Sequence, residues 1–416
     1  MQPQTPRGTK DIYGPEAASW RALEAVIHGL CADFCFNEIR TPVFEHTELF
    51  QRSSGETSDV VQKEMYTFLD KGGRSISLRP EGTAGAARAF VEHNMQAGGL
   101  PVKLFYIGPN FRYEKPAAGR WRQHHQFGAE LYGAYAPAAD AEVISMAREY
   151  FSRLGIADVT RLHINSLGGK ECRQAYNNRL HAFIMENTDS LCPTCRERAE
   201  KNPLRVLDCK EERCRAVLKD APVPLDTLGP ECRAHFENLQ SLLRLMGIDF
   251  VVDARLVRGL DYYTRTVFEF IDEKSGLTIC AGGRYDGLIE QCGGAPTGGV
   301  GFGSGIERLM LVLEREGKLP AAEAGARVYV GSIGEKGFEK SREVVYKLRQ
   351  AGVPAEWDVM ERSVKAQMRY ADKLGVEYSL ILGDDEMESG RVTVKDMRTG
   401  EKMEVEIDGL ENMLRQ

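Results

Sequence analysis

Residues 327–416 most restrict the possible fold, because strand-like apolar runs alternate there with helix-like spacing. The strand-like runs are Val328–Val330, Ala355–Trp357 and Tyr378–Leu382, and the apolar spacing between them predicts helices. A strand–helix–strand–helix–strand order is typical of a compact α/β unit. We therefore predict a separate C-terminal domain, preceded by a linker in the Gly- and Ala-rich stretch after residue 320.

Residues 1–320 follow a different pattern, in which strands pair as neighbours and helices separate the pairs. Segments 104–107 and 126–132 are expected to form antiparallel strands joined across a long tip, and segments 266–271 and 278–281 a further pair. Helices are predicted near the N-terminus, after Pro80 and over 139–155. From about 168 to 247 the pattern is mostly helical, which indicates an insertion. The fold class is therefore α+β, with an antiparallel sheet flanked by helices.

Charge and cysteine content limit the possible surroundings of the protein. The 416 residues include 54 Lys+Arg and 61 Asp+Glu, a net charge of −7, which argues against indiscriminate coating of nucleic acid. The N-terminus has no apolar signal region, and no run approaches the length of a membrane span, so we expect a cytoplasmic protein without membrane contact. The ten cysteines are then expected to be mostly thiols.

The glycine run Gly298–Gly305 does not have the spacing of a dinucleotide-binding loop, and no lysine-bearing phosphate loop occurs. A triphosphate would therefore have to be held by arginines. Segment 103–122 offers five basic residues against the single acid Glu114. Such a run alone is more often a solvated hairpin tip than a binding site.

Six segments in order resemble the motifs of class II aminoacyl-tRNA synthetases, and specifically of the histidyl-tRNA synthetase family. They are Arg40–Glu45, Arg79–Thr83, Phe111–Glu130, Leu256–Thr264, Ala281–Leu288 and Gly301–Leu309. The resemblance implies ATP-dependent ligation of L-histidine to tRNA(His) through a histidyl-adenylate, with Mg²⁺ accompanying ATP. It also implies a homodimer, a catalytic core over 1–320 and an anticodon-binding domain over 327–416. The alternative is a catalytically silent, histidine-binding regulatory subunit of the same fold.

The resemblance also implies roles for individual residues. Catalysis is assigned to Arg112, Arg258 and Arg308, because fixed guanidinium groups stabilise charge that develops at the α-phosphorus. ATP binding is assigned to Arg112, Glu114, Arg120 and Arg308. Histidine binding is assigned to Glu81, Gly82, Thr83, Gln126, Glu130, Arg258, Tyr262 and Tyr263. Glu81 has a plainer interpretation as a helix-capping residue.

Three further features leave alternatives open. His124 and His125 invite a catalytic or metal-binding interpretation, but we expect structural roles. Cys192, Cys195, Cys209 and Cys214 could form a structural zinc site, and free thiols are the alternative. In the C-terminal part, 15 Lys+Arg stand against 18 Asp+Glu, so RNA recognition would need a local patch, and Arg362, Lys365 and Arg369 at helical spacing are one candidate.

Overall fold

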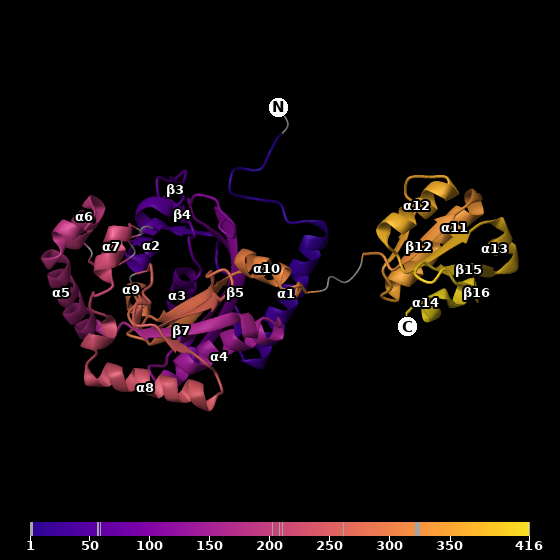
Figure 1. Ribbon diagram of the computed structural model, residues 1–416. Helices are drawn as coiled ribbons and strands as arrows, with labels where there is room; N and C mark the ends of the chain where they lie inside the picture. Colours follow the sequence, from indigo (N-terminus) through magenta and orange to yellow (C-terminus); the bar gives the residue numbers. More distant parts are fainter. Residues whose placement is uncertain are drawn as a thin grey trace. The chain divides into compact units, whose positions relative to one another are not determined.

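The computed structural model describes residues 3–55, 58, 60–201, 203–207, 209, 211–260, 262–320 and 325–415. The chain divides into two compact units, Met1–Pro320 and Ala321–Gln416. In Figure 1 the elements of the second unit carry the labels β12 to α14. Most of the segment predicted as a linker, residues 321–324, lies outside the described residues. Among the described helices, none is both long and apolar enough to cross a bilayer.

An eight-stranded sheet with the order β1-β5-β6-β11-β10-β9-β7-β8 forms the centre of the first unit. Six strands are antiparallel: β5 (Val102–Phe111), β6 (Gln123–Tyr132), β11 (Gly299–Gly305), β10 (Thr278–Arg284), β9 (Thr264–Asp272) and β7 (Thr160–Ser166). The short edge strands β1 (Asn37–Glu38) and β8 (Val251–Val252) run parallel to their neighbours. The predicted antiparallel sheet is confirmed.

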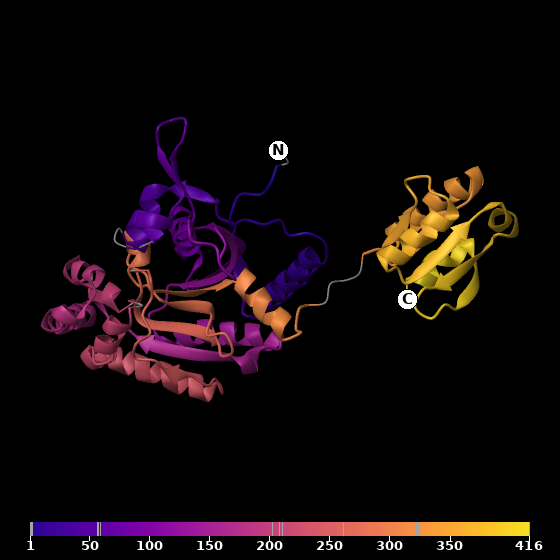
Figure 2. The same ribbon diagram turned by 45° about the horizontal axis from the view of Figure 1, so that its top comes forward.

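One face of this sheet is covered by helices that pack on it around an apolar core. The helices packed there are α1 (Gly14–Asp33), α4 (Pro137–Arg153), α8 (Pro230–Leu245) and α10 (Ile306–Arg315). Figures 1 and 2 show α4 and α8 along this face. Phe127, Phe268 and Phe302 point into this core from three different strands and are almost completely buried. Because side chains alternate along a strand, the residues between them face the opposite side.

The predicted insertion is helical. It contains α5 (Lys170–Glu186), η4 (Thr188–Ser190), α6 (Pro193–Lys201), η5 (Pro203–Val206), α7 (Glu212–Leu218), η6 (Pro224–Thr227) and α8. Helices α5, α6 and α7 form a lobe at the left of Figure 1 with a small core of its own, whereas α8 packs on the main core. The insertion is therefore partly an outlying lobe and partly a support for the sheet.

The opposite face of the sheet is covered only in part. Helix α3 (Thr83–Glu92) and the short α9 (Leu288–Gln291) pack there around Phe90, Tyr132 and Tyr285. A three-stranded sheet, β2 (Phe44–His46), β4 (Ser75–Leu78) and β3 (Thr67–Leu69), lies in the same unit, and its β3–β4 hairpin projects in Figure 2. The remaining elements are α2 (Thr47–Ser54), the π-helix η1 (Val60–Glu64), η2 (Met95–Gly98) and η3 (Ala157–Val159).

The second unit is an α/β domain with the strand order β13-β12-β14-β15-β16. The predicted alternation appears as β12 (Val328–Ser332), α11 (Gly334–Gln350), β13 (Ala355–Trp357), α12 (Val364–Leu374) and β14 (Tyr378–Leu382). The sequence analysis did not predict the hairpin β15 (Arg391–Asp396) and β16 (Lys402–Glu406), nor the short elements α13 (Asp384–Ser389), η7 (Ile407–Gly409) and α14 (Leu410–Leu414).

Candidate active site

Glycines on β11 make room for two long polar side chains on the open face of the sheet. Gly301 pairs with Glu130, and Gly305 pairs with Gln126. A Cβ atom at Gly301 would lie 2.0 Å from Oε2 of Glu130, and one at Gly303 would lie 2.0 Å from Nε2 of Gln126. Glycine generally weakens a β-strand. Here it is required, because any larger residue at either position would collide with these side chains of β6. The sequence analysis missed this strand.

Glu130 is completely buried among hydroxyl groups. Its Oε1 accepts hydrogen bonds from Thr83 Oγ1 at 2.8 Å and Tyr106 OH at 2.9 Å, and its Oε2 accepts one from Tyr285 OH. Burial raises the pKa of Glu130 to about 8, although the three hydroxyl donors favour the ionised form. A carboxylate offers about four acceptor positions, so Oε2 keeps the capacity for a further donor.

Glu81 is a second buried carboxylate, at the N-terminus of α3. Its oxygens accept hydrogen bonds from the backbone N–H groups of Thr83 at 2.9 Å and Ala84 at 3.0 Å, and Tyr262 OH lies 3.5 Å from Oε2. Burial raises the pKa of Glu81, while the hydrogen bonds from the helix N-terminus oppose that shift. Glu81 therefore caps the helix and also faces the aromatic group around Glu130. A Cβ at Gly82 would lie 2.2 Å from the Tyr106 ring, so glycine is needed between them.

A pocket of about 270 Å³ opens beside these carboxylates and has a strongly basic lining. Six predicted site residues line it: Arg112, Glu114, Arg120, Gln126, Arg258 and Arg308. Arg112 Nε donates to the carbonyl oxygen of Pro80 at 2.8 Å, and Arg308 donates to the carbonyl oxygens of Gly119 at 3.2 Å and Thr278 at 3.0 Å. Within the described residues, Arg112 and Arg308 have no carboxylate ion-pair partner, which leaves their charges uncompensated for an anion.

Arg258 is held differently, by a carboxylate on the sheet. Its Nη1 donates to Glu269 Oε1 on β9, and Glu269 Oε2 accepts a hydrogen bond from Thr278 at 2.8 Å. The guanidinium carbon lies 5.8 Å from the centre of the Tyr263 ring. Among the described residues, the buried Nε atom of Arg258 has no hydrogen-bond partner. Arg258 therefore connects the pocket to the aromatic group and keeps one donor available.

The two adjacent histidines have separate structural environments. His124 lines the pocket, and burial, together with Arg112 and Arg308, lowers its pKa to about 3, so its ring is neutral. His125 faces Glu307, whose Oε1 lies 2.9 Å from Nδ1 and whose two oxygens accept from the His125 backbone N–H. The contacts of His125 with Glu307 fix β6 against α10.

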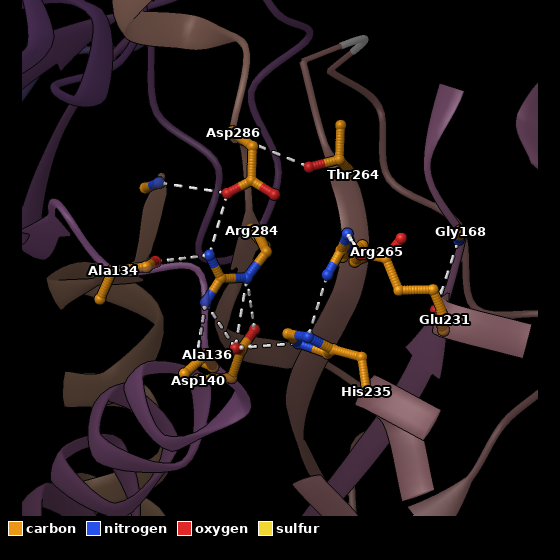
Figure 3. A network of polar contacts seen from close by, with 12 residues as sticks. Ala134, Ala136, Asp140, Gly168, Glu231, His235, Thr264, Arg265, Arg284 and Asp286 are labelled. Atoms are coloured by element: carbon orange, nitrogen blue, oxygen red, sulfur yellow. Dashed lines mark hydrogen bonds and ion pairs between the residues drawn. The ribbon is translucent and has the colours of Figure 1, made fainter. Parts of the chain in front are cut away.

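A buried ionic network holds the segment that carries Tyr285. Figure 3 shows Arg284 between Asp140 and Asp286, and it donates to Asp140 Oδ2 at 2.7 Å and to Asp286 Oδ1 at 2.9 Å. His235 Nε2 lies 3.2 Å from the same Asp140 oxygen. Burial alone would raise the pKa of Asp140, but the contacts with His235 and Arg284 hold it below its ordinary value. The network joins α4, α8 and the end of β10, so it fixes the position from which Tyr285 reaches Glu130.

The structure thus brings the predicted residues into two adjoining groups. One contains Glu81, Thr83, Glu130, Tyr262 and Tyr263, and the other contains the arginines of the pocket. Three contributors were missed by the sequence analysis: Tyr106, Tyr285 and Glu269. Tyr285 lies inside one of the quoted motifs, and that position was the available signal for it. Tyr106 and Glu269 become recognisable only through strand register.

The two remaining predicted groups lie elsewhere. The four cysteines of the insertion lie together, with all Sγ atoms within 4.8 Å of one another. In the second unit, Lys365 and Arg369 are exposed on α12, whereas Arg362 pairs with Asp358 at 2.9 Å and lies over the Tyr370 ring. Part of the predicted basic patch is therefore already engaged within its own domain.

Comparisons with known proteins agree over the whole chain. Residues 8–309 match the family model described as Histidyl-tRNA synthetase, and residues 327–416 match the one described as Anticodon binding domain. Two proteins named Histidine--tRNA ligase, from Acetivibrio thermocellus and Thermoanaerobacter pseudethanolicus, are each 50% identical over 418 residues and 100% of both chains. The crystal structure of apo S. aureus histidyl-tRNA synthetase is similar with a TM-score of 0.85 and 37% identity, covering 100% of each chain.

Proposed function

The chain belongs to the histidyl-tRNA synthetase family, and on that premise we propose that it ligates L-histidine to tRNA(His) with ATP. In the first step, a carboxylate oxygen of histidine attacks the α-phosphorus of ATP, and pyrophosphate leaves. In the second step, a terminal ribose hydroxyl of the tRNA attacks the carbonyl carbon of the histidyl-adenylate, and AMP leaves. One observation supports this most strongly: uncompensated arginines adjoin a buried carboxylate that retains acceptor capacity.

Histidine would bind at the carboxylate group. An imidazole N–H would donate to Glu130 Oε2, which among the described residues accepts a hydrogen bond only from Tyr285 OH and so keeps acceptor capacity. Glu81, Thr83 and Gln126 would hold the α-amino group, and Tyr262 and Tyr263 would enclose the ring. A site that hydrogen-bonds its substrate rejects analogues without the matching groups by about 10⁴–10⁵.

ATP would bind in the arginine-lined pocket. Arg112 and Arg308 carry positive charges that suit its phosphates. Arg120 adds a third positive charge, and its Nε lies 3.7 Å from Glu114 Oε2. Arg258 would meet the reacting carboxylate and the α-phosphate, because it lies between the two groups. Negative charge that grows on the phosphoryl oxygens is then stabilised by cations already in position.

Mg²⁺ would accompany ATP. This ion prefers oxygen ligands and is usually held by phosphates with one or two carboxylates. Glu114, on the pocket wall, and Glu269, beside Arg258, would offer carboxylate oxygens of that kind. Bound there, the ion would neutralise phosphate charge, while the arginines orient the α-phosphorus.

The second unit would bind the anticodon, in keeping with its family match. Lys365 and Arg369 are exposed on one helix and are the cations available on the predicted patch. A homodimer is supported by exposed apolar residues on and beside the small sheet, namely Val43, Phe44, Phe68 and Leu69. A cytoplasmic location is supported by the ten cysteines, which all lie among the described residues and form no disulfide.

Histidine-dependent exchange of labelled pyrophosphate into ATP tests the proposal. The full chain should catalyse exchange with histidine and not with the other amino acids. A chain that binds histidine but catalyses no exchange would be the silent regulatory subunit instead, and exchange with a different amino acid would refute the assigned specificity.

A further inference from the structure

The insertion lobe contains a four-thiol cluster that plays no part in the chemistry proposed above. Its members are Cys192, Cys195, Cys209 and Cys214, and each offers one sulfur atom. Three of them are buried, and Cys209 is partly buried. The catalytic pocket is lined by other residues, so the cluster needs an explanation of its own.

The sulfur positions suit a tetrahedral metal ion better than a pair of disulfides. With Zn–S bonds of about 2.3 Å, the sulfurs of a tetrahedral site are separated by about 3.8 Å. The Sγ atoms of Cys192 and Cys209 lie 3.9 Å apart, and all four lie within 4.8 Å of one another. A disulfide requires about 2.05 Å between its sulfurs. The thiols therefore converge on one point instead of pairing.

The backbone around the cluster supplies donors to the sulfurs. The N–H of Cys195 points to Cys192 Sγ at 3.4 Å, and the N–H of Cys192 points to Cys214 Sγ at 3.2 Å. Donors of this type orient and stabilise ligands that carry negative charge in a metal site. Cys192 and Cys195 are separated by two residues at the start of α6, which is a common ligand spacing for zinc.

The lobe has a small core of its own. This core consists of the four cysteines and of apolar side chains mainly from α5, α6, η5 and α7, and no strand of the described structure enters it. Such small cores are usually reinforced by a metal or by disulfides. The C-terminal end of α7 is tied to the main domain, because Arg255 Nη1 donates to the Leu218 carbonyl oxygen at 2.8 Å.

We propose that Cys192, Cys195, Cys209 and Cys214 bind one zinc ion, which links the start of α6 to α7 and holds the insertion lobe together. All four ligand positions are filled by protein sulfur, so the ion is structural and has no open position for a substrate. The inference does not depend on the proposed catalytic roles, because the cluster is separate from the pocket.

The first test is the metal content of the full chain, purified without added metal and again after exposure to zinc. We expect about one equivalent of zinc per chain, and cobalt substitution should give the absorption of a tetrahedral thiolate site. Cys214→Ser should lower the zinc content to about a tenth of an equivalent or less. Cys232→Ala is the matched control: it removes another buried insertion thiol outside the cluster and should keep the metal.

The second test follows the lobe itself. Trypsin should cut within residues 193–219 faster after chelation, and zinc should restore protection in the Cys232→Ala chain but not in the Cys214→Ser chain. Zinc below about a tenth of an equivalent after reconstitution would overturn the proposal, as would two disulfides found by alkylation and mass spectrometry. If Cys214→Ser does not fold, the cobalt spectrum and the protease protection of the wild-type chain still decide the matter.

Discussion

The two groups of the candidate site use opposite means to prepare for their ligands. In the arginine-lined pocket, Arg112 and Arg308 are held by backbone carbonyl groups and keep their charges available. In the carboxylate group, Glu130 is surrounded by hydroxyl donors, and burial raises its pKa to about 8. The first arrangement suits charge that increases during a reaction, and the second suits the recognition of one side chain. Changes in the two groups should therefore affect different kinetic constants.

Replacing Arg258 should have the largest effect. Arg258→Ala is expected to lower kcat for pyrophosphate exchange by about 10²–10³, with a much smaller change in histidine affinity, because the charge it meets develops only in the transition state. Steady-state exchange kinetics and equilibrium binding of histidine measure the two quantities. Arg161→Ala, which removes an exposed ion pair with Glu273, is the control and should change neither. An unchanged kcat would remove Arg258 from the chemistry.

The next largest effect is expected at Glu130. Measured above pH 8, where the Glu130 side chain is ionised, Glu130→Gln should raise KM for histidine by about 10–100-fold, since a hydrogen bond to a charged group contributes about 1.5–3 kcal/mol. KM for ATP should change little, because ATP binds in the arginine-lined pocket and not in the carboxylate group that contains Glu130. Glu273→Gln is the exposed control. Equal loss of affinity for both substrates would show that the two groups do not act separately.

The pH dependence of stability should also distinguish Glu130. Its pKa in the folded chain is about 8 against an ordinary value of 4.5, so between these pH values the folded state holds a proton that the unfolded state has lost. Stability therefore decreases as pH rises through this range, by about 1.4 kcal/mol per pH unit at most. Glu130→Gln should lack this slope. The unfolding temperatures of the wild-type and Glu130→Gln chains, measured over this pH range, test the prediction. If the two temperatures change with pH in parallel, the prediction is contradicted.

The smallest effect is expected at Tyr285. Tyr285→Phe removes one hydroxyl donor to Glu130 and should raise KM for histidine by about 2–10-fold, because a neutral hydrogen bond contributes about 0.5–1.5 kcal/mol. Tyr150→Phe is a close control, since that buried hydroxyl has no hydrogen-bond partner among the described residues. An effect of Tyr285→Phe on kcat alone would place Tyr285 with the arginines instead.

Much of this architecture could be predicted from the sequence because the patterns involved are local. The apolar stripe of α1, the alternation after residue 327 and the strands β9 and β10 all have periodicities that the structure retains. β11 could not be predicted in this way, since its glycines are explained by Glu130 and Gln126 on a neighbouring strand. Tyr106 likewise contacts Glu130 only through strand pairing. The contacts that the sequence analysis missed are therefore those between segments that lie far apart in the sequence.

A crystal structure of the chain with L-histidine and ATP tests the division between the two groups most directly. We predict the imidazole ring against Glu130 Oε2 and the triphosphate against Arg112 and Arg308, with Arg258 between them. A structure with the imidazole outside the Glu130 group, or with the phosphates away from these arginines, would contradict it.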